Sequence, residues 1–444
     1  MEKITNFFTN LMRKYLPEPF VLSIGLTILT MILAMIIEGQ GFIKTTTDWG
    51  QGFWNLLSLT TQIAVVLAMG YVLATAPIVD KMLNKLASRI HTPRTAIIIA
   101  TVVGCIGCYI NWGFGLIVGG VIAKKLALKV KGVHYPLIIA AGYSGFTITG
   151  LGISGTIPAL ISSSTHPMVK EIGIIPFSET IFTLPMVITS LVIIVTLPLL
   201  NAMLHPKHKE GIIEIDPSLE DAQKEAAPTN LLGESTFATK LNNSRILSYL
   251  IGFVGIAYVI IYFIHGGSLE LNMVNFIFLF LGIILLGTPG KYVASLNDGI
   301  KTISGIILQF PFYAGIMAIM AGSGLVDTIA KGFVSFSSAQ TLPFWGLVSS
   351  FIINFFAPSA GGHWTIQGPF MIHAAKELGA SIPKTAMSVQ MGAAWNDLIQ
   401  PFWVLPALAL SKLKLKDIMG YTVVMMFWVG IVYVAAFLIW GYMG

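Results

Sequence analysis

An acidic side chain interrupts one of the apolar stretches of this 444-residue chain. Asp397 follows Trp395 and Asn396, and it is the only Asp, Glu, Lys or Arg that the apolar pattern places well inside a predicted membrane segment. Because a charge at that depth costs several kcal/mol, an ionisable residue there indicates a function. Asp397 could carry a proton, or help to bind Na⁺ with carbonyl and hydroxyl oxygens. The alternative is a polar residue that caps a half-helix.

Two apolar runs, 94–128 and 342–377, each contain a short segment that breaks a helix. The first break begins at Asn111 and the second at Ala357. Lipid cannot satisfy the backbone groups that such breaks free, so buried polar side chains or a water-filled cavity must do so. Each run is therefore predicted to be a re-entrant hairpin. The half-helix that starts at each tip offers free N–H groups to an anion, which suits a small carboxylate.

A broken span follows each hairpin, at 144–156 and at 390–401. The first holds four Gly and five Ser or Thr among thirteen residues, and each Gly in a helix costs about 1 kcal/mol relative to Ala. We expect the tips and the broken spans to form one site. Its predicted substrate-binding residues are Asn111, Trp112, Gly113, Thr147, Thr149, Ser154, Ser359, Gly361, Gly362, His363 and Asn396, and its predicted ion-coupling residues are Asp397, Asn111 and Ser359.

Two histidines of the second hairpin, His363 and His373, could bind a ligand or could have a structural role. His363, at the tip, fits a ligand role and a structural role equally well, and His373, late in the returning arm, is better explained by packing. No cofactor is predicted beyond a coupling ion, H⁺ or Na⁺, and Na⁺ at the hairpin tips is the one metal site considered.

The chain also contains an internal repeat. Residues of the first half recur in the second at offsets between 247 and 250, across helix breakers and an acidic residue. A nearly constant offset predicts a duplication, and an odd number of spans between matching elements inverts the second copy. Inverted repeats with interrupted helices are typical of secondary transporters, which bind their substrate near the midplane. The matches are Gln62 with Gln309, Asp80 with Asp327, Pro93 with Pro343, Gly113 with Gly361, Pro136 with Pro383, Thr149 with Asp397 and Ile157–Leu160 with Leu405–Leu408.

Composition sets the class of protein. Apolar residues make up 55% of the chain and charged residues 10%, against roughly 25% charged in a soluble domain. The net charge of +6 fits basic cytoplasmic loops rather than nucleic-acid binding. The fold class expected is an all-α polytopic membrane protein, an inverted repeat with two re-entrant helical hairpins and two broken transmembrane helices. Nine spans are predicted, at 19–38, 59–79, 135–160, 180–204, 246–265, 272–289, 303–326, 384–411 and 418–443.

These spans divide the chain into a first repeat (1–204), a polar cytoplasmic linker (205–245), a connecting span (246–265) and a second, inverted repeat (266–444). Lys and Arg gather in the loops on one side of the membrane, which predicts a cytoplasmic N-terminus and an outer C-terminus. The marking residues are Lys3, Arg13, Lys14, Lys81, Lys85, Arg89, Arg94, Lys124, Lys125, Lys129, Lys131, Lys412, Lys414 and Lys416.

Two other functions fit parts of the sequence. Gly142–Gly145 and Gly152–Gly155 both read G-x-S-G, as in intramembrane serine proteases, with His363 or His373 as a conceivable base. A nucleophile needs its base within hydrogen-bond reach, and a protease explains neither the duplication nor the paired hairpins. Re-entrant loops also line channels, but two inverted hairpins with an acidic residue at depth fit alternating access better.

At these residues the chain resembles the short-chain fatty acid transporters of bacteria, a family associated with uptake of acetoacetate and butyrate within the ion transporter superfamily. The resemblance covers nearly the full length and is strongest at the two hairpins and at Trp395–Asp397. The segments that carry it are Tyr15–Phe20, Asn111–Gly113, Pro358–Gly362 and Trp395–Asp397.

The resemblance implies a small carboxylate substrate, a bacterial inner-membrane location, and a scaffold and a transport domain that move as an elevator, often within a homodimer. A transporter of dicarboxylates or other carboxylates in the same superfamily is the nearest alternative. In related carriers the tips bind Na⁺ through Ser, Asn and Thr, whereas Trp112 and Gly113 follow Asn111 here. That departure favours H⁺ as the coupling ion.

Overall fold

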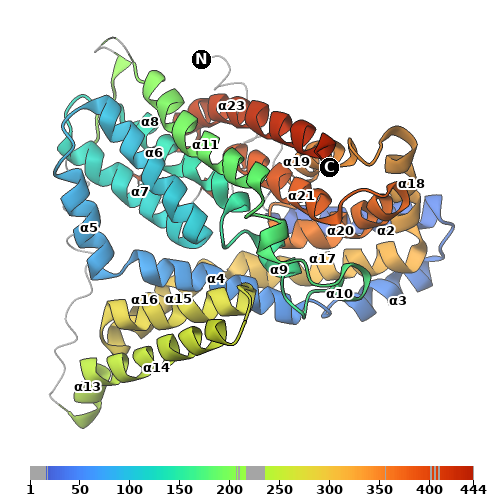
Figure 1. The fold of residues 1–444 in the computed structure, drawn as a ribbon, viewed down its shortest axis with the longest axis horizontal. Helices are drawn as coiled ribbons and strands as arrows, with labels where there is room; N and C mark the ends of the chain where they lie inside the picture. The colour runs from blue at the N-terminus through green and yellow to red at the C-terminus, as the bar shows by residue number, and fades with distance from the viewer. Residues whose placement is uncertain are drawn as a thin grey trace.

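The structure is a computed structural model, and the chain it describes is helical. It places no strand within the described residues (Figure 1). Eight helices there are long and apolar enough to cross a membrane, which confirms the predicted class of polytopic membrane protein. The described residues are 17, 19–206, 208, 211–216, 236–355, 357–400, 403–404, 407–408 and 411–443.

The helices of the first half begin with a span, a short helix, a second span and another short helix, followed by a hairpin, a broken helix and a final span. In chain order they are α2 (Pro19–Ile37), α3 (Phe42–Gly52), α4 (Leu57–Ala74), α5 (Pro77–Ala87), α6 (Pro93–Ile110), α7 (Trp112–Lys129), α8 (Tyr135–Ser144), η1 (Gly145–Leu151), α9 (Thr156–Ile161), α10 (Val169–Ile172), η2 (Phe177–Glu179) and α11 (Leu184–Met203).

The second half repeats this order after two connecting helices, α13 (Phe237–Asn242) and α14 (Arg245–Ile264). The hairpins predicted over 94–128 and 342–377 are α6 with α7, and α19 with α20. The matching helices are α15 (Leu271–Leu286), α16 (Pro289–Ile300), α17 (Ser304–Ser323), α18 (Leu325–Phe336), α19 (Leu342–Ile353), α20 (Ala360–Leu378), α21 (Ile382–Asn396), η5 (Asp397–Ile399) and α23 (Leu415–Tyr442).

The two halves interlock. Helices α2 and α3 of the first half pack on α17 of the second, while α15 and α16 of the second pack on α4 of the first. Close contacts at glycines hold both pairs together: a Cβ on Gly52 would lie 2.2 Å from the Ala318 Cβ, and one on Gly299 would lie 3.2 Å from the Ala68 carbonyl oxygen. These six helices, which we call the frame, run along one side of the molecule, and α6 to α8, α11 and α23 run along the other (Figure 1).

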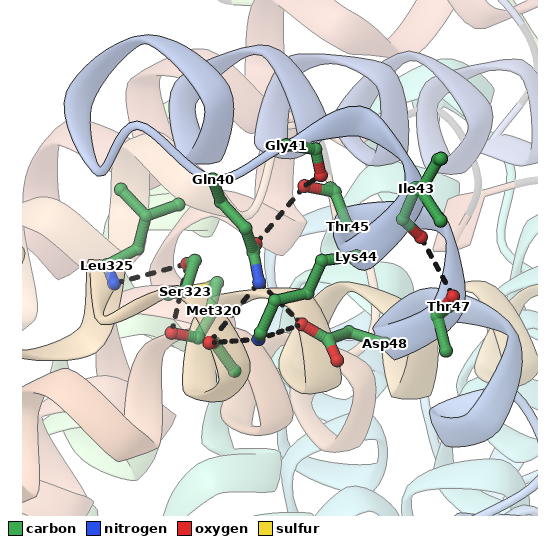
Figure 2. Close-up of polar contacts among 11 residues, drawn as sticks. Gln40, Gly41, Ile43, Lys44, Thr45, Thr47, Asp48, Met320, Ser323 and Leu325 are labelled. Atoms are coloured by element: carbon green, nitrogen blue, oxygen red, sulfur yellow. Dashed lines mark hydrogen bonds and ion pairs between the residues drawn. The ribbon is translucent and has the colours of Figure 1, made fainter.

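Polar contacts fix one short helix of the frame to a span (Figure 2). Lys44 Nζ donates to the Gly322 carbonyl oxygen at the end of α17 (2.9 Å) and pairs with Asp48 (3.1 Å). Gln40 Nε2 donates to Asp48 Oδ2 (2.7 Å) and to the same Gly322 oxygen (3.3 Å). A cation at a helix C-terminus is favourable because the last carbonyl groups carry partial negative charge.

The short helices were not predicted, and they change two boundaries. The span expected over 59–79 ends at Ala74, because Pro77 starts α5 as a separate helix. The span expected over 303–326 ends at Ser323, where Gly324 adopts a left-handed backbone (φ 95°) before α18. Helices α3, α5, α16 and α18 have 11 or 12 residues each, too few to span a bilayer.

Part of the predicted linker is held against the bundle. The Tyr135 amide donates to the Ile213 carbonyl oxygen (2.7 Å), and the Ile213 amide donates to His134 Nδ1 (3.0 Å). Burial lowers the pKa of His134 to about 4, so this imidazole is a neutral acceptor at neutral pH. Several predicted features lie outside the described residues: Lys3, Arg13, Lys14, most of the segment Tyr15–Phe20, linker residues 217–235, and Leu405 and Pro406 of the repeat.

Candidate functional site

The two broken helices cross in the interior and satisfy each other's backbone groups. The Ile157 amide, at the start of α9, donates to Gln390 Oε1 of α21 (2.8 Å). Thr147 Oγ1 donates to the Ala394 carbonyl oxygen (3.3 Å), and Tyr143 Oη donates to the Asp397 carbonyl oxygen. Groups that the two breaks would leave bare in lipid are thus paired within the protein.

Side chains of η1 explain why the first span breaks. The segment takes a 3₁₀ form over Gly145–Leu151, and Thr149 Oγ1 donates to the Phe146 carbonyl oxygen (2.6 Å). Hydroxyl groups that bind nearby carbonyls compete with the helical ladder, and glycines weaken the helix further. Gly152 also presses on the backbone of Tyr109, where a Cβ would lie 2.3 Å from the carbonyl oxygen.

Asp397 lies at the second break, and its exposed fraction is 8%. Its Oδ1 accepts a hydrogen bond from Asn354 Nδ2 (2.9 Å), which also lies 3.1 Å from Asn396 Oδ1. Asn354 follows α19, is fully buried, and receives a hydrogen bond on its carbonyl oxygen from Gln400 Nε2 (3.0 Å). Asn354 therefore joins the second hairpin to the carboxylate.

His363, in the first turn of α20, is fully buried behind Asn354. Its Nδ1 lies 3.5 Å from Asn354 Oδ1, and its Nε2 lies 3.3 Å from Ser350 Oγ and beside Gln367 Oε1. The polar groups thus form a chain from Asp397 through Asn354 to His363 and on to Gln367.

Both ring nitrogens of His363 face acceptor oxygens. Asn354 Nδ2 donates to the Ala393 carbonyl oxygen and Gln367 Nε2 donates to the Gly346 carbonyl oxygen, each at 3.3 Å. Because a backbone carbonyl only accepts, these bonds orient both amides with their oxygens toward the imidazole. An imidazole protonated at both nitrogens could donate to both of these amide oxygens. It would also place a positive charge close to Asp397, with only the Asn354 amide between them.

The first hairpin tip is closed. Asn111 is fully buried; its Oδ1 accepts from the Phe114 amide (2.8 Å) and its Nδ2 donates to the Val66 carbonyl oxygen (3.4 Å). The Trp112 amide donates to Ser154 Oγ (2.9 Å). Asn111 and Ser154, both predicted to bind substrate, thus use these groups to cap α7 and to hold its tip against the frame and the first break.

The second hairpin tip is more open. Ser359 precedes α20 without capping it through its side chain, and Ser359 and Ala360 are only partly buried. The two glycines that follow are packed closely: a Cβ on Gly361 would lie 3.2 Å from Thr156, and one on Gly362 would lie 2.2 Å from the Tyr313 ring. An uncapped helix N-terminus can bind an anion through its backbone amides.

Buried donors without a partner surround these elements. Within the described part of the chain, Trp112 Nε1, Trp364 Nε1 and Asn396 Nδ2 are buried and have no hydrogen-bond acceptor. Each belongs to a hairpin tip or to the residue before Asp397. Buried N–H groups are nearly always paired in folded proteins, so an excess of such donors fits a ligand that supplies acceptors.

The sequence missed several residues of this network. Asn354, Ser350, Gln367, Gln390 and Tyr143 were not among the predicted ligands, although they connect those that were. The available signal was a lone Asn, Asn354, in the apolar run that precedes Pro358. The predicted Thr147 and Thr149 lie at the crossing of the breaks, where their hydroxyl groups bind backbone oxygens.

The serines of the two G-x-S-G segments are paired with other groups. Ser144 Oγ donates to the Ala141 carbonyl oxygen and accepts from Asn201 Nδ2, and Ser154 Oγ accepts from the Trp112 amide. The recorded partners of His363 are Ser350, Asn354 and Gln367, and those of His373 are Asp327 and Glu377. The geometry gives no support to a nucleophile and base pair among these residues.

Inverted hairpins and crossed broken helices define a polytopic membrane protein, and this arrangement is typical of secondary transporters. Two solved structures are similar in fold. The Alcanivorax borkumensis YdaH transporter, described as having an unusual topology, aligns with a TM-score of 0.55 at 13% identity and covers 96% of this chain and 98% of its own. Neisseria gonorrhoeae MtrF, described within a class of antimetabolite efflux pumps, aligns with a TM-score of 0.56 at 15% identity and covers 96% of each chain.

The sequence comparisons are more specific. The family model described as "Short chain fatty acid transporter" matches residues 1–440, and the chain belongs to that family. A relative from Escherichia coli (strain K12), named as a candidate short-chain fatty acid transporter, is 38% identical over 437 residues, which cover 97% of this chain and 98% of the relative. A relative of the same name from Haemophilus influenzae is 39% identical over 429 residues, which cover 95% and 96%.

Proposed function

We propose that this protein is a symporter that carries a short-chain monocarboxylate, of the butyrate or acetoacetate type, across the membrane together with a proton. Membership of the short-chain fatty acid transporter family supports the substrate class. The observation that carries the proposal is the polar chain from Asp397 through Asn354 to His363, directly behind the open tip of α20.

The carboxylate binds at the start of α20 in this proposal. The backbone amides of the first turn, from Ala360 to Gly362, point toward an anion at the tip, because helical N–H groups face the N-terminus. Trp364 Nε1, in α20, and Asn396 Nδ2, beside Asp397, are donors without an acceptor among the described residues. No Lys or Arg is needed, and the short acyl tail needs only an apolar wall.

The proton offsets the charge of the substrate. A carboxylate substrate and an ionised Asp397 would place two negative charges in a poorly hydrated interior, which is costly. The proton binds at Asp397, or at His363, which Asn354 links to Asp397. In either case the site with its substrate carries one negative charge fewer across the membrane. Na⁺ coupling is the competing possibility, and dicarboxylate transport is the competing substrate class.

Movement and orientation complete the proposal. The frame stays fixed while the hairpins and broken helices move across the membrane as an elevator, within a homodimer in the bacterial inner membrane. The N-terminus is cytoplasmic and the C-terminus lies outside, which the Lys and Arg in the loops support.

The test is uptake of labelled butyrate by proteoliposomes that contain the purified protein. We expect butyrate to accumulate inside when the outside is more acidic than the inside, and not to accumulate under a Na⁺ gradient alone. Liposomes without protein control for free diffusion of the protonated acid. Accumulation driven by Na⁺ would contradict the coupling ion, and uptake of succinate but not butyrate would contradict the substrate class.

A further inference from the structure

A second polar region lies between the frame and the loop that follows α9. A pocket of about 520 Å³ opens there, lined by the first turns of α4 and α15, by that loop and by Val65. This volume falls within the range of small-molecule sites. Six neutral polar residues line it: Ser58, Thr61, Gln62, Thr165, Asn272 and Asn275.

Asn275 lines this pocket and carries a buried acceptor. The residue is 92% buried, since its exposed fraction is 8%, and its Nδ2 donates to the Gln62 carbonyl oxygen (3.0 Å). That bond fixes the orientation of the amide, because the backbone oxygen can only accept. The Oδ1 of Asn275 is buried and has no hydrogen-bond partner among the residues that the structure describes. A ligand that fills the pocket would therefore be favoured if it carried a donor.

The wall beside Asn275 offers donors as well. Gln62 Nε2 donates to Asn272 Oδ1 (2.8 Å), so the Nδ2 of Asn272 remains available. If the two amides are both turned over, Gln62 Nε2 becomes the available donor instead. Either arrangement leaves one amide donor in a pocket that Ser58 also lines, and amide and hydroxyl donors suit a carboxylate.

We propose that this pocket is a vestibule that binds a short-chain hydroxy acid, with the carboxylate on the amide and hydroxyl donors and the substrate hydroxyl group donating to Asn275 Oδ1. The inference rests on the proposed function and deepens it, because it names hydroxy acids as the preferred substrates. Gln62 precedes Val66 by one helical turn, and Val66 contacts the first hairpin tip. With neutral donors only, the vestibule holds the acid weakly enough to pass it inward.

The experiment is equilibrium binding of labelled 3-hydroxybutyrate and of labelled butyrate to the purified protein in detergent. We expect the wild type to bind the hydroxy acid about tenfold more tightly, since a site built to pair a hydroxyl group discriminates against a ligand without it. Asn275→Leu keeps the size of the side chain and removes the acceptor, so the two affinities should become equal. Equal affinities in the wild type, or a preserved preference in Asn275→Leu, would overturn the proposal.

A second variant guards against misfolding of the first. Ser58 is exposed, so Ser58→Trp can fill the pocket without disturbing the core and should weaken binding of both acids. Binding at wild-type affinity in Ser58→Trp would show that the ligand lies elsewhere and would overturn the proposal. Thr47→Val is the matched control, because the Thr47 hydroxyl group bonds only within α3, to the Ile43 carbonyl oxygen (2.8 Å).

The two proposals fail in different ways. Asp397→Asn should abolish proton-driven accumulation and leave vestibular binding intact. If proteoliposomes accumulate no short-chain acid, the proposed function is wrong, while the binding assay still decides whether the pocket recognises a hydroxyl group.

Discussion

The two hairpins bring their arms together in different ways. Glycines join α6 and α7: a Cβ on Gly115 would lie 2.1 Å from the Cys108 amide nitrogen, and one on Gly107 would lie 2.8 Å from the Gly115 Cα. The residue that matches Gly115 in the second hairpin, at the offset of 248, is His363. Where the first hairpin packs backbone on backbone, the second places an imidazole in a polar chain that reaches Asp397.

The same contrast recurs where each hairpin meets its neighbouring short helix. Lys125 of α7 pairs with Asp80 of α5 (2.8 Å), and His373 of α20 pairs with Asp327 of α18 (3.2 Å). Lysine is charged at neutral pH, whereas histidine is charged only when it is protonated. The duplication thus supplies the same two hairpin positions twice, and the second copy has a histidine at both of them, His363 and His373. The predictions below test that difference.

The largest effect is expected at Asp397. Asp397→Asn should abolish accumulation of butyrate against its gradient and keep part of the exchange of internal for external butyrate, because the variant retains the shape of the site and loses the ionisable group. Thr149→Ser, at the matching position of the first copy, is the control and should accumulate normally. Full accumulation by Asp397→Asn would remove this carboxylate from the mechanism.

The next largest effect is expected at His363. His363→Asn should lower proton-driven uptake by about tenfold, because a buried polar group left without its partner costs about 1–3 kcal/mol and about 1.4 kcal/mol is a factor of ten in rate. It should also flatten the dependence of uptake on pH. His373→Asn, at the exposed end of the same helix, should change uptake far less. Equal losses in the two variants would contradict a special role for the buried histidine.

The first hairpin should respond in stability rather than in coupling. Gly115→Ala forces a methyl group against the backbone of α6 and should cost about 1–3 kcal/mol, as overpacking does. A thermal unfolding scan in detergent should show a lowered Tm. Gly332→Ala is the matched control, since nothing lies within 4 Å of a Cβ there. A Gly115→Ala protein as stable as wild type would mean that the arms can separate freely.

The smallest effect is expected at the ion pair of the second hairpin. His373→Lys keeps a cationic side chain against Asp327, so the variant should transport much like the wild type, whereas His373→Ala removes the pair. The exposed fractions of the two side chains are 38% and 59%, and exposed ion pairs contribute at most about 1 kcal/mol. Uptake rates should therefore shift by less than about fivefold. An uptake rate in His373→Ala that equals the wild-type rate would show that this pair does not affect transport.

The sequence predicted the elements that depend on helix breakers. Glycine and proline at the two tips located both hairpins, and a constant offset through Asp80 and Asp327 identified the duplication. The short helices α3 and α16 were missed because 11 or 12 residues are too few for a span and their apolar residues occupy one face only. Their charged residues are typical of loops, and the sequence alone does not show that the two helices pack on α17 and α4.

The site was only partly predictable for a similar reason. Asp397 is visible because a charge in an apolar run is rare, but Asn354 precedes it by 43 residues and no spacing rule joins them. Asn111 was predicted to bind substrate because it is a polar residue at the predicted tip of the first hairpin. In the structure its side-chain amide bonds to Phe114 and Val66, and only the tertiary structure could reveal the contact with Val66.

The most direct test of the central claim is the point of zero net flux. Proteoliposomes are prepared with a fixed butyrate gradient, the opposing pH gradient is varied, and the pH difference at which net butyrate movement stops is recorded for the wild type and for Asp397→Asn. After subtraction of the flux in protein-free liposomes, we expect net movement through the wild type to stop when about one pH unit opposes a tenfold butyrate gradient, as one proton per butyrate requires. We expect Asp397→Asn to exchange butyrate without any net movement that depends on pH. A wild-type zero point that ignores pH, or a variant that still follows it, would contradict proton coupling through Asp397.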